Sequence, residues 1–239
     1  MFLRMASVAR IDTRTEAGAT WELLRRGDAW DIVVDGQPVM RSTEARIEKQ
    51  LVDLALAPWE TRDDLLVLVA GLGMGLTLRA LLDRPQVKEV LVLERSATVV
   101  AWAKDQLAPL NGGACADRRV TVVVGELGAH LRGGSDSEAP RPGGFFVILL
   151  DTDVWPEALS RPENVEFYHE DGLLLLETAL RPGGVLAMST ARRDDDLDRR
   201  LRLRYQSVAR IAVPTETDGE HRLYYVYRGR RSSVGGGEG

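Results

Sequence analysis

From residue 65 onward, short apolar runs alternate with stretches of helical periodicity, and this alternation limits the fold more than any other feature. Helical periodicity lies at 76–84, 96–107 and 167–180. The apolar runs, which we expect to form buried strands, are LLVLVA (65–70), VKEVLVLE (87–94), RVTVVVGE (119–126), FFVILLD (145–151) and VLAMST (185–190). Strands and helices in such alternation form right-handed crossovers and a parallel sheet with helices on both faces. The sequence therefore predicts an α/β fold with a Rossmann-like, doubly wound, mostly parallel sheet.

The two ends of the chain have a different character. Strand-like runs at 204–214 and 221–229 are joined by TETDGE, whose Asp-Gly pair favours an antiparallel hairpin. TWELLRRGDAWDIVVDGQPVM suggests two or three short strands that turn at 26–28 and 35–36. We therefore predict a β-rich N-terminal extension, a connecting helix, a Rossmann-like core and a disordered tail, at residues 1–41, 42–60, 61–230 and 231–239.

Composition excludes several classes of function. The net charge of −5 and the pI near 5.4 argue against a nucleic-acid binder, which would need a basic face. A single cysteine excludes an intramolecular disulfide, and three dispersed histidines give no metal-ligand spacing. No apolar stretch is long enough to cross a membrane and no cleavage signal is present, so we expect a cytoplasmic protein without a metal site.

A glycine-rich turn follows the first core strand. Gly71, Gly73 and Gly75 stand between that strand and a predicted helix, and Glu94 ends the next strand. Glycines at this place let a ligand approach the backbone, and an acid after the second strand accepts the hydroxyls of a ribose. The alternative, a tight turn without a ligand, is less favoured by the complete strand–turn–helix–strand–acid pattern. We predict a bound nucleoside.

Two further strand ends carry candidate site residues. Gly125 and Glu126 end the third strand, where an acid would accept from the adenine amine or would simply be solvated. Asp151 and Asp153 follow the fourth strand at the carboxyl edge of the sheet, where open α/β sheets bind ligands. Carboxylates there would orient or deprotonate a nucleophile, whereas the structural alternative is a helix cap or a loop-ordering role.

The spacing of the glycines discriminates between nucleosides. A dinucleotide fingerprint has glycine at the sixth position of GxGxxG, but Leu76 stands there, and no Walker motif is present. The GxGxG spacing suits S-adenosyl-L-methionine, which has no pyrophosphate. A nicotinamide-dependent oxidoreductase is accordingly the least favoured enzyme class.

The chain resembles the bacterial spermidine-synthase-like proteins of the class I S-adenosylmethionine-dependent methyltransferase superfamily. The resemblance rests on five stretches: VVDGQPVMRS, VLVAGLGMGLTLRALL, LVLERSATVVAWAK, RVTVVVGE, and the segment from ILLDTDVWPEAL through RPGGVLAMST. It implies a small N-terminal β-domain before the core, and a homodimer. It also implies S-adenosylmethionine or its decarboxylated form as cofactor, polyamine chemistry and a small-molecule acceptor.

The chain departs from this family at two places. Aminopropyltransferases carry an aspartate inside the glycine turn that binds the amine of the decarboxylated cofactor, and Met74 holds that place here. Their DSSDPxGP-like stretch reads DTDVWPEA, in which Asp151 matches the first acid. Loss of the turn aspartate removes a group that would repel the carboxylate of intact S-adenosylmethionine.

The leading hypothesis from the sequence is therefore a methyltransferase that acts on a small amine- or hydroxyl-bearing metabolite. The alternatives are an aminopropyltransferase that uses the decarboxylated cofactor and, from another class, a non-catalytic nucleoside-binding protein. The acceptor stays open, because its specificity depends on loops that no motif decodes.

Overall fold

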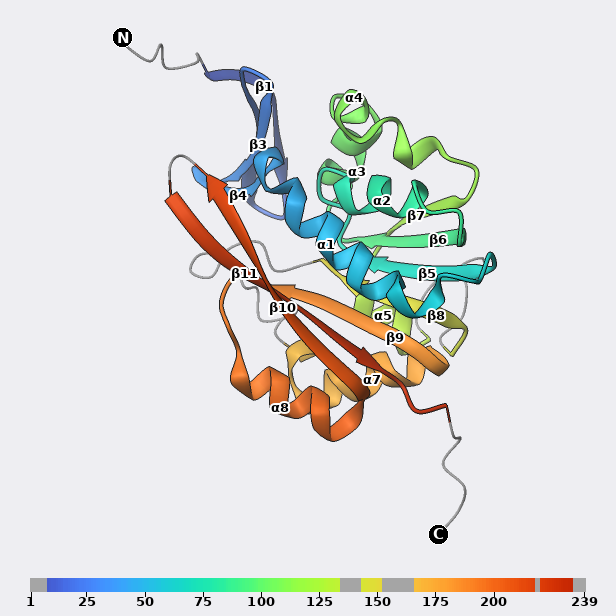
Figure 1. The fold of residues 1–239 in the computed structure, drawn as a ribbon. Helices are drawn as coiled ribbons and strands as arrows, with labels where there is room; N and C mark the ends of the chain where they lie inside the picture. The colour runs from blue at the N-terminus through green and yellow to red at the C-terminus, as the bar shows by residue number, and fades with distance from the viewer. Residues whose placement is uncertain (1–7, 134–142, 152–165, 218–219, 234–239) are drawn as a thin grey trace.

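A computed structural model describes residues 8–133, 143–151, 166–217 and 220–233. Its larger sheet has seven strands in the order β10-β11-β9-β8-β5-β6-β7 (Figure 1). Strands β5 to β9 are mutually parallel, and β9, β11 and β10 pair antiparallel. The strands are β5 (Leu65–Ala70), β6 (Val87–Glu94), β7 (Val120–Val124), β8 (Phe145–Leu150), β9 (Leu180–Thr190), β10 (Gln206–Thr217) and β11 (Glu220–Arg230). The predicted α/β class, parallel sheet and C-terminal antiparallel strands are confirmed.

Helices cover both faces of this sheet because the central strands are apolar on both sides. Alternate residues of β5 point to opposite faces: Val67 and Val69 enter one core cluster, and Leu68 and Ala70 enter the other. The first face is covered by α1 (Ala45–Leu56), α2 (Leu76–Leu82) and α3 (Ala97–Lys104), and the second by α5 (Leu127–Leu131), α7 (Glu170–Ala179) and α8 (Asp195–Arg204). A further short helix, α4 (Ala108–Asn111), follows α3.

One strand is longer than the sequence indicated. β9 begins at Leu180, directly after α7, whereas the RPGG sequence predicts a turn there and a strand from residue 185. Its pairing with β8 shifts register between Phe145 and Val147, and Gly183 has a φ of +77°. The glycines therefore form an irregularity inside the strand, and the predicted turn is part of β9. The Asp218-Gly219 turn and residues 234–239 of the predicted tail lie outside the described residues.

The N-terminal part forms a separate four-stranded antiparallel sheet in the order β1-β2-β3-β4. Its strands are β1 (Val8–Glu16), β2 (Ala19–Arg26), β3 (Ala29–Val34) and β4 (Gln37–Arg41). The turns after β2 and β3 fall where the glycines predict them, with Asp35 and Gly36 at φ of +48° and +78°. The first strand was not predicted, because VARIDTRTE is polar and most of it is exposed. The division of the chain into domains stays a prediction.

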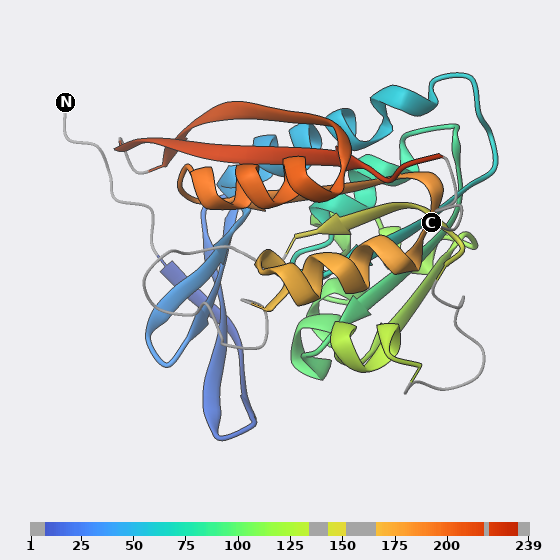
Figure 2. The same cartoon turned by 90° about the horizontal axis from the view of Figure 1, so that it is seen from below.

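The small sheet stands to one side of the core, as Figure 2 shows, and contacts it through an apolar face. Leu23 and Ile32 of that face are fully buried in a cluster with Met74, Trp102 and Leu107 of the core. The Trp102 indole N–H also donates to Asp12 Oδ2 over 2.7 Å. This contact brings Met40 of β4 next to the glycine turn. Along the described part of the chain, no helix combines the length and the apolarity that a membrane crossing needs.

A second carboxylate of β1, after Asp12, joins the small sheet to α3. Glu16, the last residue of β1, accepts hydrogen bonds from the backbone N–H groups of Ala97 (2.8 Å) and Thr98 (3.3 Å) and from the Ser96 hydroxyl. Burial raises the pKa of Glu16, but the hydrogen bonds from Ser96 and the first turn of α3 outweigh it, so the pKa lies below its usual value of 4.5. The ionised form is thus the one that the folded state favours.

We expect Glu16→Gln to lower the stability at neutral pH by about 1 kcal/mol, since the N-terminal turn of α3 loses its anionic partner. A lowered pKa in the folded state means that this contribution is present above the ordinary pKa and is lost as the pH falls through the lowered one. Denaturant titrations between neutral pH and about pH 3 measure it. Glu22→Gln, on β2 and paired with Arg10, is the control. An equal effect of both variants at neutral pH would contradict the prediction.

Candidate functional site

The glycine turn is held in a strained path that only glycine adopts easily. Gly71, Gly73 and Gly75 have φ values of +96°, +52° and +83°. The Gly71 N–H donates to Leu93 O and the Gly75 N–H to Leu72 O, each over 2.9 Å. A Cβ on Gly73 would fall 2.7 Å from both Sδ and Cε of Met40, which comes from β4 of the small sheet. The turn therefore lies directly beneath a side chain of the N-terminal sheet.

The buried side-chain amide of Asn111 supports the glycine turn from the side of the core. Asn111 is fully buried, and its Nδ2 donates to Met74 O (3.1 Å) and Ala103 O (2.9 Å). Its Oδ1 accepts from the backbone N–H groups of Gly113 and Ala114. A Cβ on Gly75 would come within 2.9 Å of Asn111 Nδ2. Asn111 thus joins the turn to α3 and to the loop after α4, and no motif in the sequence indicated this role.

Glu94, the predicted ribose ligand, lies at the end of β6 with both carboxylate oxygens directed to backbone. Oε2 accepts from the Leu72 N–H over 2.9 Å, and Oε1 accepts from the Ser96 N–H over 2.8 Å. Burial raises the pKa of Glu94, and the hydrogen bonds from Ser96, Leu72 and Gly73 act against that rise. Glu94 therefore orders the glycine turn, and its contact with a ribose stays a prediction.

Gly125 and Glu126 lie beside Glu94, as the order of the strands requires. The Gly125 N–H donates to the Glu94 carbonyl over 2.9 Å, and Glu126 is an exposed residue directly before α5. This arrangement leaves the Glu126 carboxylate accessible to a ligand bound over the ends of β6 and β7. The adenine contact stays a prediction.

Asp151 extends from the carboxyl end of β8, next to the glycine turn. Its backbone N–H donates to Ala70 O over 3.0 Å, and its Oδ2 accepts from the hydroxyl of Thr77, in α2, over 2.5 Å. Burial raises the pKa of Asp151, and the hydrogen bond from Thr77 acts in the opposite direction. A half-buried carboxylate of raised pKa is a stronger base than a solvated one. Asp153, its predicted companion, lies outside the described residues.

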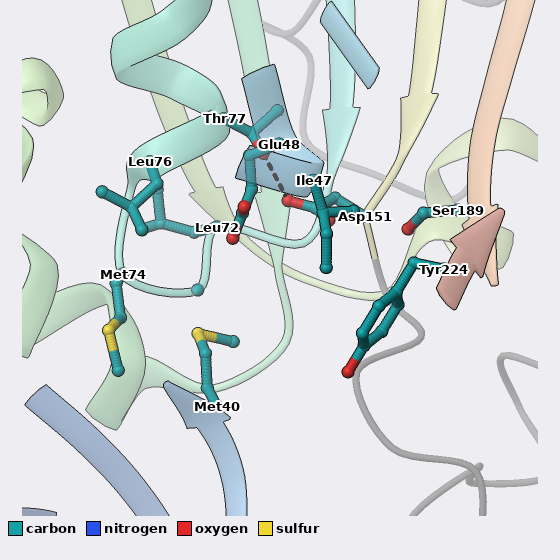
Figure 3. A pocket seen from close by; sticks show the side chains of 11 residues that line it. Met40, Ile47, Glu48, Leu72, Met74, Leu76, Thr77, Asp151, Ser189 and Tyr224 are labelled. Atoms are coloured by element: carbon teal, nitrogen blue, oxygen red, sulfur yellow. Dashed lines mark hydrogen bonds between the residues drawn. The ribbon is translucent and has the colours of Figure 1, made fainter. Parts of the chain in front are cut away.

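A pocket lies between the glycine turn, α1 and the C-terminal hairpin (Figure 3). Its charged lining residues are Asp151 and Glu48, and none of the described lining residues is Lys, Arg or His. The pocket is lined by Met40, Ile47, Glu48, Leu72, Gly73, Met74, Leu76, Thr77, Asp151, Ser189 and Tyr224. With two carboxylates and no basic side chain among the described lining residues, the lining favours a positively charged ligand.

The sequence identified only part of this lining. It gave Gly73, Met74 and Asp151, but not Thr77, Glu48 or Tyr224, which reach the pocket from α2, α1 and β11. Thr77 could have been found as the first polar residue of the helix that follows the turn. Glu48 and Tyr224 carry no local signal, because only the packing of α1 and the hairpin brings them here.

Met74 is mainly a core residue, whereas the sequence predicted a residue that contacts the cofactor. It is 2% exposed and packs with Leu23, Ile32 and Trp102 in the cluster beneath the small sheet. The substitution of an apolar residue at this place is therefore explained by packing. It removes a charge from the turn, but Asp151 and Glu48 keep the pocket acidic, so the inference of a carboxylate-tolerant site does not hold.

Comparisons of the sequence agree with this geometry. No protein-family model matches the chain. The polyamine aminopropyltransferase of Mycobacterium tuberculosis is 30% identical over 171 residues, which cover 69% of this chain and 29% of the relative. Polyamine aminopropyltransferase 2 of Streptomyces coelicolor is 31% identical over 175 residues, which cover 70% of this chain and 29% of the relative. The chain thus matches less than a third of the length of these curated relatives.

Comparisons of the structure extend over nearly the whole chain. The crystal structure of spermidine synthase from Thermotoga maritima superposes with a TM-score of 0.72 at 18% identity, covering 94% of this chain and 74% of the other. The fold is that of a spermidine synthase. A spermidine synthase in complex with the transition-state analogue AdoDATO gives a TM-score of 0.71 at 18% identity, covering 94% of this chain and 73% of the other. The spermidine-synthase-like character inferred from the sequence is confirmed.

The leading functional hypothesis is corrected by these comparisons. Methyl transfer was favoured because Met74 replaces the turn aspartate, yet the sequence relatives are named as polyamine aminopropyltransferases and the superposed structures as spermidine synthases. The alternative, aminopropyl transfer, agrees with them. The physical reason is that the charge of the pocket depends on more than the turn, because Glu48 of α1 and Asp151 after β8 also line it.

Proposed function

We propose that the chain transfers an aminopropyl group from decarboxylated S-adenosylmethionine to an amine acceptor. The observation that carries the proposal is Asp151, held by Thr77 in a pocket whose charged lining residues are carboxylates. Both the donor and a polyamine acceptor are cations, and such a pocket attracts them. The names of the sequence relatives support the same chemistry.

In this reaction the donor lies along the glycine turn, with its ribose toward Glu94 and its adenine toward Glu126. The acceptor nitrogen forms a bond to the propyl carbon next to the sulfonium. The carbon–sulfur bond breaks, and its electron pair stays on sulfur, which leaves as the neutral thioether methylthioadenosine. Asp151 orients the nitrogen and accepts the proton that it releases. Most of the rate comes from alignment of nitrogen, carbon and sulfur.

The test is to incubate the full chain with decarboxylated S-adenosylmethionine and a panel of linear diamines, with intact S-adenosylmethionine in a parallel arm. We expect methylthioadenosine and an aminopropylated amine with the decarboxylated donor. Methylated product from the intact donor, without aminopropyl transfer, would refute the proposal. Tight binding of the donor without turnover on the whole panel would instead support a non-catalytic nucleoside-binding protein.

The Thr77 hydrogen bond should be visible in the pH dependence of transfer. Burial raises the pKa of Asp151 and Thr77 lowers it, so Thr77→Val should raise it further. Since the ionised carboxylate is the active form, the acidic limb of the kcat/KM profile should move to higher pH. Thr77→Ser keeps a hydroxyl and serves as the control. An unchanged acidic limb in Thr77→Val would contradict the role given to this bond.

The assembly and location of the protein also remain proposals. A homodimer and a cytoplasmic location follow from the resemblance and from the composition. Size-exclusion chromatography with light scattering tests the first, and fractionation of cells tests the second.

A further inference from the structure

Glu48 is a pocket residue that neither the sequence motifs nor the comparisons assign. It lies in the first turn of α1, next to Ile47, which is 6% exposed and packs in the core cluster under the sheet. Because Ile47 and Leu51 fix that face of the helix, the position of Glu48 relative to the sheet is fixed as well. Figure 3 shows its carboxylate extending toward the glycine turn, near Leu72 and close to the Thr77–Asp151 pair.

The glycine turn itself offers no charge to a ligand. The residues from 71 to 76 read GLGMGL, and Met74 is buried in the cluster beneath the small sheet. Within the described part of the chain, selection between donors by charge is therefore left to the other side chains that line the pocket. Among the described lining residues, those with a formal charge are Glu48 and Asp151.

These two carboxylates have different surroundings. Asp151 follows β8, and its carboxylate is held by the hydrogen bond from the Thr77 hydroxyl. Glu48 comes from α1, and its carboxylate lies on the side of Leu72 (Figure 3). Two separate carboxylates can serve two cationic groups at once, and aminopropyl transfer requires two: the terminal ammonium of the donor and the amine of the acceptor.

We propose that Glu48 binds the terminal ammonium of the group to be transferred, and that it thereby selects the decarboxylated donor. The inference rests on the proposed aminopropyl transfer. A carboxylate next to the glycine turn attracts an ammonium, while the α-carboxylate of intact S-adenosylmethionine, bonded to the carbon that bears the amine, would be brought close to a like charge in a half-buried site. Glu48 is thus a specificity-determining residue that acts from α1.

The experiment compares the wild type with Glu48→Gln and Glu48→Asp. Titration calorimetry gives the dissociation constants of decarboxylated and intact S-adenosylmethionine for each protein. Glu89→Gln, an exposed position near the start of β6, is the control for loss of one negative charge. Thermal unfolding of each variant shows that it is folded before binding is measured.

We expect the wild type to prefer the decarboxylated donor and Glu48→Gln to lose roughly tenfold or more of that preference, as removal of one charged hydrogen-bonding partner implies. Glu48→Asp should restore part of it, and Glu89→Gln should behave as the wild type. In the transfer assay, the loss in Glu48→Gln should appear in the KM for the donor more than in kcat.

The outcomes separate this inference from the proposed function. If the wild type transfers aminopropyl groups and Glu48→Gln keeps the full preference, the role of Glu48 is refuted and the proposed function stands. If the wild type itself binds the intact donor more tightly and does not transfer aminopropyl groups, both fail. If Glu89→Gln loses as much preference as Glu48→Gln, the effect is one of net charge, and the inference is again refuted.

Discussion

Asp151→Asn should lower kcat/KM for aminopropyl transfer by about 10²- to 10⁴-fold, the range that removal of a general base produces. The amide keeps the size of the carboxylate but cannot accept the proton that the acceptor nitrogen releases. It also lacks the negative charge that holds a cationic acceptor in line with the sulfonium carbon. The transfer assay with decarboxylated S-adenosylmethionine measures the loss.

Asp151→Asn should lose activity without losing stability. Because burial raises the pKa of Asp151, the ionised side chain is disfavoured in the folded protein at neutral pH, and the neutral amide removes that cost. We therefore expect an unchanged or higher melting temperature for Asp151→Asn. Asp196→Asn, on the exposed side of α8, is the matched control and should leave both quantities unchanged. Retention of more than about a tenth of the activity would contradict a general-base role for Asp151.

Asn111→Ala should lower the free energy of unfolding by about 3 kcal/mol, because each buried group left without a partner costs about 1 to 3 kcal/mol. The change removes the donor to Met74 O and Ala103 O and the acceptor for Gly113 and Ala114. The glycine turn would lose its support, so donor binding should weaken together with stability. Denaturant unfolding and calorimetry measure the two effects.

The control for Asn111→Ala is Leu110→Ala, at the adjacent position, which removes a partly buried apolar side chain without leaving polar groups unpaired. We expect a smaller loss of stability there and little effect on donor binding. If Leu110→Ala weakens donor binding as much as Asn111→Ala does, general loosening of α4 explains the result and the specific role of the amide is wrong.

Local patterns predicted the elements that depend on neighbouring residues. The five parallel strands, the turns at 26–28 and 35–36, and the positive φ values of the glycine turn all follow from short stretches of sequence. β1 was missed because VARIDTRTE has little apolar character, and it is a strand because it pairs with β2. The extension of β9 across RPGG was missed because its pairing with β8 and β11 outweighs local turn propensity.

The candidate site residues also fall into those that local sequence predicts and those that only the folded structure brings together. Gly71, Gly73, Gly75 and Asp151 could be found because a strand end next to a turn is a local feature with a fixed chemical use. Glu48, Tyr224 and Asn111 could not be found, because they come from a helix, a hairpin and a loop that meet only in the folded protein. The mistaken preference for methyl transfer has this origin, since it weighed Met74 without the acids that face it.

The sequence by itself determined the α/β class, the parallel sheet and the position of the glycine turn. The periodicity of apolar residues and the placement of glycines are set by residues that are close together in the chain. Only the tertiary structure decided the charge of the pocket. Electrostatic potential depends on distance through space. Glu48 of α1 and Asp151 after β8, about a hundred residues apart in the chain, line the same pocket only after the sheet and α1 have packed.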